Sequence, residues 1–211
     1  MLLLQRIRNH DAIERGGHVL HILNTVLLLL SGMQIAYPAF AVFGSMDNAR
    51  LVHFVDMYLF LFVGVFHVYQ FFATGKLMTA GPLPRNLKTF WGTLKYYLFI
   101  ERAEPPHGKY NPLQIITYFL LFVLSAIQVV LGFTLYWPAK LSFIVVAFGG
   151  LMTVRMLHLT VAWIFLAFVA LHLYLILTQP LRKSASMFTG SYWRRMEPET
   201  GKADVVKGPT P

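Results

Sequence analysis

Two histidines, His158 and His172, interrupt a long apolar run that covers residues 154–178. They lie fourteen positions apart, which is about 21 Å and almost four turns of an α-helix, so both imidazoles face nearly the same way at different depths. A run of this length can cross a bilayer. An imidazole inside hydrocarbon needs a partner, and this spacing therefore predicts two metal centres at two depths, for which haem irons are the obvious candidates.

Six of the eight histidines fall in long apolar runs, and antiparallel threading of these runs sorts them into two layers. An iron with a neutral imidazole on each face of the haem carries electrons and leaves no position for a substrate. Other metal ions are less suitable, because they would also require carboxylates or thiolates and Asp56 is the only acidic residue within a run. The outer layer offers His53 with His158, and the inner layer offers His172 with either His18 or His67.

An arginine precedes three of these histidines by three positions, in the pairs Arg15–His18, Arg50–His53 and Arg155–His158. On a helix this spacing puts each guanidinium about one turn outward from its imidazole, where it can bind a haem propionate. The alternative is that each arginine only extends to the lipid headgroups. The repeated spacing favours the three histidines as ligands, but His53 and His67 repeat the fourteen-residue spacing of the last run, so His67 stays open as the alternative to His18.

The composition is that of an integral membrane protein. Of the 211 residues, 56% are hydrophobic and 13% charged, and the mean hydropathy is +0.57. The net charge of +9 resides in the connections between apolar runs, so it indicates loops beside lipid headgroups rather than nucleic-acid binding. The absence of cysteine excludes disulfides, iron–sulfur clusters and c-type haem attachment in this chain.

The apolar runs predict an all-α integral membrane protein, a four-transmembrane-helix bundle. We expect a haem-binding membrane domain over residues 1–180 and a cytoplasmic tail over residues 181–211, which ends in a disordered GKADVVKGPTP segment. Between the second and third spans, the segment RNLKTFWGTLKYYLFIER predicts an interfacial amphipathic helix. The four spans are expected at about residues 18–37, 50–72, 112–137 and 154–178.

Lysine and arginine are distributed unevenly between the two sides. Fifteen of the 18 lie in the N-terminal segment, the long connection between the second and third spans, and the C-terminal tail. The positive-inside rule then places both termini in the cytoplasm and the two short connections outside the cytoplasmic (inner) membrane.

Several stretches of the sequence resemble the di-haem b-type cytochrome subunits of membrane-bound NiFe hydrogenases and the γ subunit of respiratory formate dehydrogenase. They are ERGGHVLHILNTVLLLLSG, ARLVHF, KYNPLQIITYFLLF, GFTLYW, RMLHLTVAWIFLAFVALHLYLIL and SMFTGSYWRR. The resemblance implies that His53 and His158 bind the outer haem and that His18 and His172 bind the inner one. It also implies a quinone pocket beside the inner haem, with Asn111, Gln114 and His172 as contacts.

The residues themselves give Asn111 a simpler role as the helix N-cap before Pro112. With the resemblance, we expect a cytochrome b subunit of a respiratory oxidoreductase complex, which passes electrons through two b-type haems but is not catalytic for the primary substrate alone. It would connect the quinone pool, menaquinone or ubiquinone, to a periplasmic dehydrogenase, hydrogenase or reductase that carries iron–sulfur or c-type haem centres. The alternative is a non-redox membrane anchor or transporter subunit for a periplasmic complex.

Overall fold

Four long helices dominate the computed structural model, which describes residues 4–8, 10–75, 80–108, 110–178 and 181–195. They are α1 (Ala12–Ala36), α2 (Met46–Ala73), α5 (Pro112–Tyr136) and α7 (Leu151–Thr178). Each is long and apolar enough to cross a membrane. The prediction of an all-α membrane protein with four spanning helices is therefore confirmed.

The first spanning helix begins at Ala12, six residues before the predicted start. Asp11 and Glu14 form a capping box at this end: the Glu14 N–H donates to Asp11 Oδ1 at 2.7 Å, and the Asp11 N–H donates to Glu14 Oε2 at 3.3 Å. These two bonds satisfy backbone donors that would otherwise be left unpaired at the helix end. The helix therefore runs through Gly16 and Gly17, which lie before the predicted start at residue 18.

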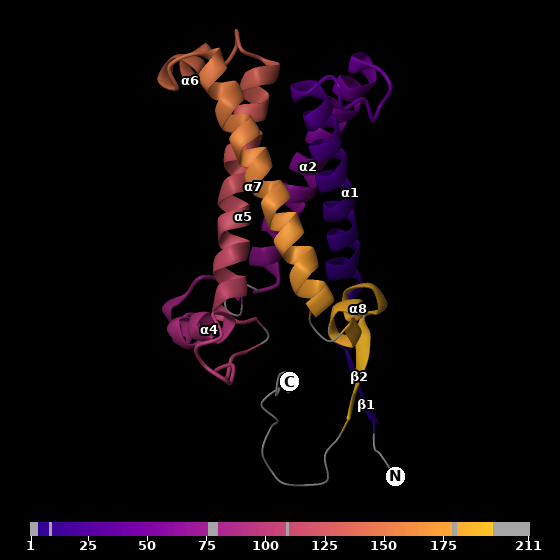
Figure 1. Cartoon of the computed structure of the whole chain (residues 1–211), viewed down its shortest axis with the longest axis vertical. Helices are drawn as coiled ribbons and strands as arrows, with labels where there is room; N and C mark the ends of the chain where they lie inside the picture. The colour runs from indigo at the N-terminus through magenta and orange to yellow at the C-terminus, as the bar shows by residue number, and fades with distance from the viewer. Residues whose placement is uncertain (1–3, 9, 76–79, 109, 179–180, 196–211) are drawn as a thin grey trace. The chain divides into compact units, whose positions relative to one another are not determined.

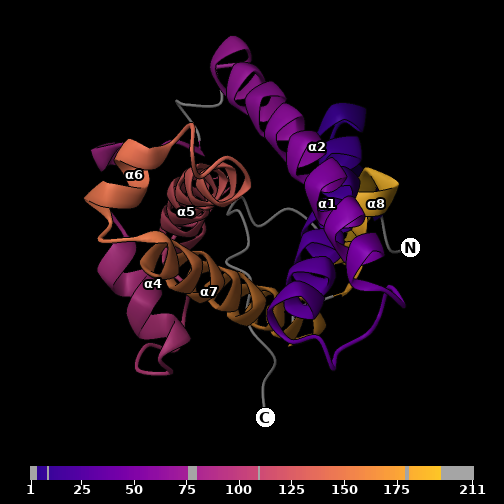
Figure 2. The ribbon, with the colours of Figure 1, turned by 90° about the horizontal axis from the view of Figure 1, so that it is seen from above.

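The chain divides into two compact units, of which the first comprises Met1–His67 and Ile127–Glu197. Besides parts of the spanning helices, it contains α6 (Ser142–Ala147), α8 (Leu181–Thr189), β1 (Leu4–Arg8) and β2 (Ser191–Arg195). The two strands pair antiparallel, with Leu4 opposite Arg195, and α8 lies beside the start of α1 in both views (Figures 1 and 2).

Neither the strand pair nor α8 was predicted, because the paired segments lie at opposite ends of the chain and are too short to show a clear period. Gly190 makes the turn from α8 into β2 with φ +81°, a conformation that glycine adopts without strain. The final GKADVVKGPTP segment, predicted to be disordered, falls outside the described residues.

The second unit contains the end of α2 and the start of α5, within Val68–Ala126. Between them lie η1 (Pro84–Asn86) and α4 (Phe90–Tyr97), which occupies the segment predicted to form an amphipathic helix. Gly92 of α4 lies so close to Pro105 that a Cβ on the glycine would sit 2.7 Å from the proline Cγ. This contact holds the loop before α5 against α4.

Candidate metal centre

The outer histidines lie opposite each other in the first unit. His53 of α2 and His158 of α7 have ring centres 6.3 Å apart and ring planes at 80°. A metal bound between two imidazoles has bonds of about 2 Å, and each nitrogen lies about 1 Å from its ring centre, so the centres would lie about 6 Å apart. The observed separation matches an iron held between these two rings.

A serine on α1 sets the protonation of the His53 ring. The Ser31 hydroxyl donates its only proton to the Leu27 carbonyl, at 2.5 Å, and its oxygen lies 2.9 Å from His53 Nδ1. Because that proton is already used, the serine oxygen accepts from Nδ1–H. His53 Nε2 is then left with a free lone pair, which is the form that binds a metal.

We expect Ser31→Ala to weaken haem retention at the His53 site by about 10-fold or more, because losing such an orienting partner typically weakens a metal site by that amount. The measurement is haem content during stepwise detergent washing. Thr160→Ala is the matched control, since Thr160 Oγ1 also donates to a helix carbonyl, that of Met156 at 2.8 Å, but its side chain is exposed. Equal retention in the two variants would contradict this role of Ser31.

The opposite ring, His158, has a buried nitrogen that lacks a protein partner. The Gln128 amide on α5 donates to the His158 carbonyl at 3.1 Å and lies 3.4 Å from Nε2. Nδ1, in contrast, is buried with no hydrogen-bond partner among the described residues. An unpaired buried ring nitrogen is costly unless another group bonds it.

Glycines allow helix backbones to approach both outer rings. A Cβ at Gly32 of α1 would lie 3.2 Å from His53 Cε1, and a Cβ at Gly132 of α5 would lie 3.3 Å from His158 Cε1. These contacts are tighter than ordinary van der Waals packing. The two rings are therefore enclosed by four helices of the first unit, α1, α2, α5 and α7.

The inner layer repeats the geometry of the outer one. The ring centres of His18 on α1 and His172 on α7 are also 6.3 Å apart, with planes at 66°. His172 stacks on Phe168 at 5.7 Å, and His18 meets Phe188 of α8 edge to face at 6.2 Å. The same metal geometry therefore fits this pair.

His67, the alternative inner ligand, lies against α1 instead. Its ring centre is 4.4 Å from that of His21, which is too short for a metal held between two facing imidazoles. Its Nδ1–H donates to the Val63 carbonyl at 2.9 Å. A Cβ at Gly17 would meet its Nε2 at 2.5 Å, so α1 approaches this ring closely only because position 17 is glycine.

The three arginines have different surroundings. Arg15 is half-buried, its Nη1–H donates to the Phe188 carbonyl at 3.0 Å, and its Nε is buried without a partner among the described residues. The side chain of Arg50 is 55% exposed, 4.0 Å from Asp47, and Arg155 is exposed. Of the three, Arg15 has the buried, unsatisfied donor that best suits a carboxylate.

Asn111 and Gln114 cap the start of α5, within the second unit. The Gln114 N–H donates to Asn111 Oδ1 at 2.9 Å, and the Asn111 N–H donates to Gln114 Oε1 at 3.0 Å. The buried Asn111 amide also donates to Glu104 Oε1 at 3.2 Å and to the Tyr97 hydroxyl at 3.3 Å. The expected N-cap is present, and the buried Asn111 side-chain amide makes two further hydrogen bonds.

Sequence reasoning missed four residues that contact the candidate site residues. Ser31 and Gln128 were detectable, because a polar residue in an apolar run is a signal of function or of a buried contact. Glu104 gave no such signal because it lies in a polar connection, and Tyr97 gave none because it lies in the segment predicted to be an interfacial helix, where phenols are common.

The residues present fit haem better than a protein-held metal ion. The described residues contain no group of three or more His, Asp or Glu that could hold such an ion, whereas haem iron needs only two axial ligands from protein.

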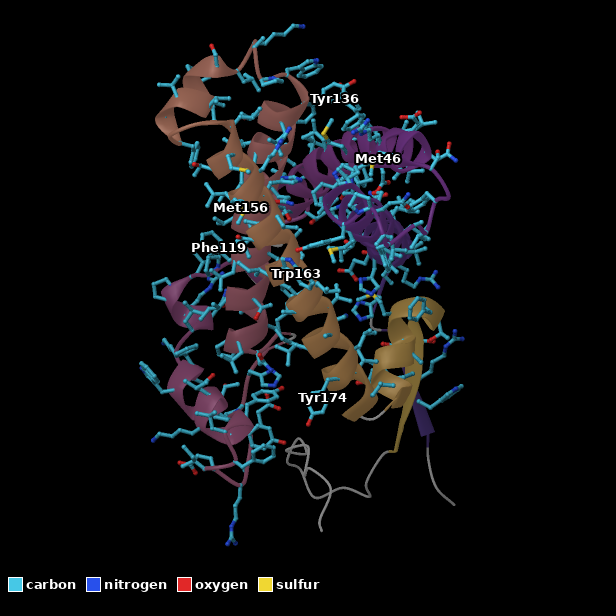
Figure 3. The ribbon with its side chains drawn as sticks, turned by 45° about the horizontal axis from the view of Figure 1, so that its top comes forward. Met46, Phe119, Tyr136, Met156, Trp163 and Tyr174 are labelled. Atoms are coloured by element: carbon cyan, nitrogen blue, oxygen red, sulfur yellow. The ribbon has the colours of Figure 1, made fainter. Side chains whose placement is uncertain are left out.

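Along α7, which carries one histidine of each pair, Met156, Trp163 and Tyr174 mark the course of the helix (Figure 3). The two pairs therefore lie at different depths, because each contributes one histidine to this helix.

Comparison with known proteins gives matches over most of the chain. The sequence profile of the prokaryotic cytochrome b561 family matches residues 9–190. The chain is 26% identical to a protein of Azotobacter vinelandii described as a probable Ni/Fe-hydrogenase B-type cytochrome subunit, over 85% of this chain and 84% of that one. A protein of Escherichia coli (strain K12), described as a probable Ni/Fe-hydrogenase 1 B-type cytochrome subunit, is 25% identical over 81% and 82%.

These matches agree with the paired imidazoles, because b-type haem is held by axial side chains without covalent attachment. They favour electron transfer over the non-redox anchor or transporter that the sequence left as an alternative. The profile covers all four spanning helices and both histidine pairs, and the chain is thus a multi-pass membrane cytochrome of the prokaryotic cytochrome b561 family.

Proposed function

We propose that this chain holds two b-type haems and passes electrons between a periplasmic redox partner and the quinone pool. The observation that carries the proposal is the repeated 6.3 Å separation of ring centres, in His53–His158 and again in His18–His172. Haem iron supplies the one-electron chemistry when it is bound. The chain supplies the ligands, their protonation state and an apolar surrounding.

The outer haem is assigned to His53 and His158, and the inner one to His18 and His172. His18 is preferred to His67 because its ring lies at the required distance from His172, whereas His67 lies against His21. Arg15 is proposed to bind an inner propionate through its unsatisfied Nε. Arg50 and Arg155 are assigned to the outer propionates by their spacing from the outer histidines alone.

A quinone is proposed to bind at the start of α5, where Asn111 and Gln114 present amide groups. Asn111 is 4% exposed and bonded on several sides, so it is rigidly held, whereas Gln114 is exposed. The proposed contribution of His172 to this pocket rests on the resemblance. We place both termini of this inner-membrane protein in the cytoplasm. The quinone would then take its protons from the cytoplasm. Electrons that reach it from the periplasmic side would generate a membrane potential.

The partner is proposed to be a Ni/Fe hydrogenase, since the relatives are described as cytochrome subunits of such enzymes. Its electrons would enter from an iron–sulfur or c-type haem centre on the outer side. The chain is then the quinone-reactive subunit of the complex, and hydrogen chemistry belongs to the partner.

The purified protein is expected to show a b-type α band on reduction and about two haems per chain. Pyridine haemochrome analysis with quantitative amino-acid analysis gives this ratio. A preparation that folds and inserts into membranes but binds no haem would contradict the proposal and favour a non-redox anchor.

A further inference from the structure

Next to the proposed quinone site, the second unit holds an acid–base pair that the proposed function does not use. Glu104 Oε1 lies 3.2 Å from His107 Nε2. Both residues lie in the loop between α4 and α5, with side chains 21% and 23% exposed, respectively. The same Glu104 oxygen accepts the buried Asn111 amide at 3.2 Å. The pair therefore connects solvent to the residue proposed to hold the quinone.

The hydrogen bonds of His107 determine how many protons the pair holds. His107 Nδ1 lies 2.8 Å from the Gly108 carbonyl, which can only accept, so Nδ1 carries a proton. The Nε2–Oε1 contact is then a hydrogen bond only if it contains a further proton. That proton is shared between the imidazole and the carboxyl group. The pair thus carries one proton that it can give up.

The surrounding groups hold the carboxylate in place. Pro105, the residue after Glu104, packs on Gly92 of α4. Tyr97 of the same helix bonds Asn111, and burial together with the nearby Glu104 carboxylate raises the pKa of the Tyr97 phenol. Tyr97 therefore stays protonated at neutral pH. The ring centre of Tyr96 lies 5.4 Å from that of Tyr97.

We infer that Glu104 and His107 form the group that delivers protons to the quinone bound beside Asn111. This inference rests on the proposed function. Reduction of a quinone to a quinol takes two electrons, which the haems would supply when bound, and two protons. After each electron, the pair gives one proton to a quinone oxygen, and His107 takes up another from cytoplasmic water through its exposed ring edge. Asn111 positions the carboxylate and does not itself transfer a proton.

The test uses the intact complex with its electron-donating partner, reconstituted in vesicles with a water-soluble quinone. We expect Glu104→Gln to reduce the rate constant of quinone reduction by about 100-fold, the usual contribution of a positioned acid. Haem content and haem reduction by the partner should be unchanged. Glu101→Gln, in the same loop with an exposed side chain, is the matched control and should behave as wild type. Glu104→Asp should restore part of the rate.

Two further readouts separate proton delivery from a structural role. His107→Gln should slow quinone reduction as Glu104→Gln does, while haem reduction by the partner stays unchanged. A reduced-minus-oxidised infrared spectrum should show a carboxyl signal that is absent in Glu104→Gln. If Glu104→Gln changes only the quinone KM, or keeps the wild-type rate, the inference is wrong. If the haem-loaded wild type reduces no quinone, the proposed function itself fails.

Discussion

His158→Ala is expected to lower the haem content from about two to about one per chain, with loss of the outer haem. His53 and His158 would together hold the outer haem, and the His53 imidazole alone would not be enough to retain it. The inner pair, His18 of α1 with His172 of α7, forms a separate layer and should retain its haem. A redox titration followed at the α band should change from two components to one.

The control for this experiment is His21→Ala, which also removes an imidazole from a spanning helix. His21 lies against His67 at 4.4 Å and is not assigned as a ligand, so its loss should leave both redox components. A His158→Ala protein that still contains both haems would show that the outer assignment is wrong.

The second prediction compares the two candidates for the fourth ligand. His18→Ala should lose the inner haem and keep the outer one, because the His18 ring centre lies 6.3 Å from that of His172. His67→Ala should keep both haems, because His67 bonds Val63 and packs on His21 and Gly17. Haem content and low-spin electron paramagnetic resonance signals distinguish these results.

The opposite outcome, with haem lost in His67→Ala and retained in His18→Ala, would make α2 and α7 the two ligand helices of both centres. A loss in both variants would indicate that the His21–His67 contact is needed to hold α1 in place. His67→Gln would then separate the two roles, since glutamine retains a side chain that can bond the Val63 carbonyl but is a poor axial ligand for haem.

The local sequence was sufficient for several features of the site. The two layers follow from the fourteen-residue spacing on an α-helix, and the cap at Asn111 follows from its place before Pro112. The spanning helices follow from hydropathy, and their ends differ by a few residues where a local cap, such as Asp11 with Glu14, extends a helix. These features depend on neighbours close in sequence, so the sequence contains the necessary information.

The choice between His18 and His67 could not be made in this way. Fourteen residues fall short of four turns by only about 40°, so His53 and His67 face nearly the same way, as His158 and His172 do, and the crossing of helices decides what each ring meets. Gly17 lets α1 approach His67 closely, and this contact turns His67 toward His21. No local pattern shows which glycine lies against which imidazole.

The sequence by itself determined the class of protein, its four spans, the depth of each histidine and the absence of cysteine-based centres. Only the tertiary structure brought the His18 ring close to that of His172, Ser31 to His53 and Glu104 to Asn111. The physical reason is that hydropathy and helical period act along one chain segment. Ligand pairs and hydrogen bonds instead join different helices or loops, whose relative rotation and approach depend on packing throughout the unit.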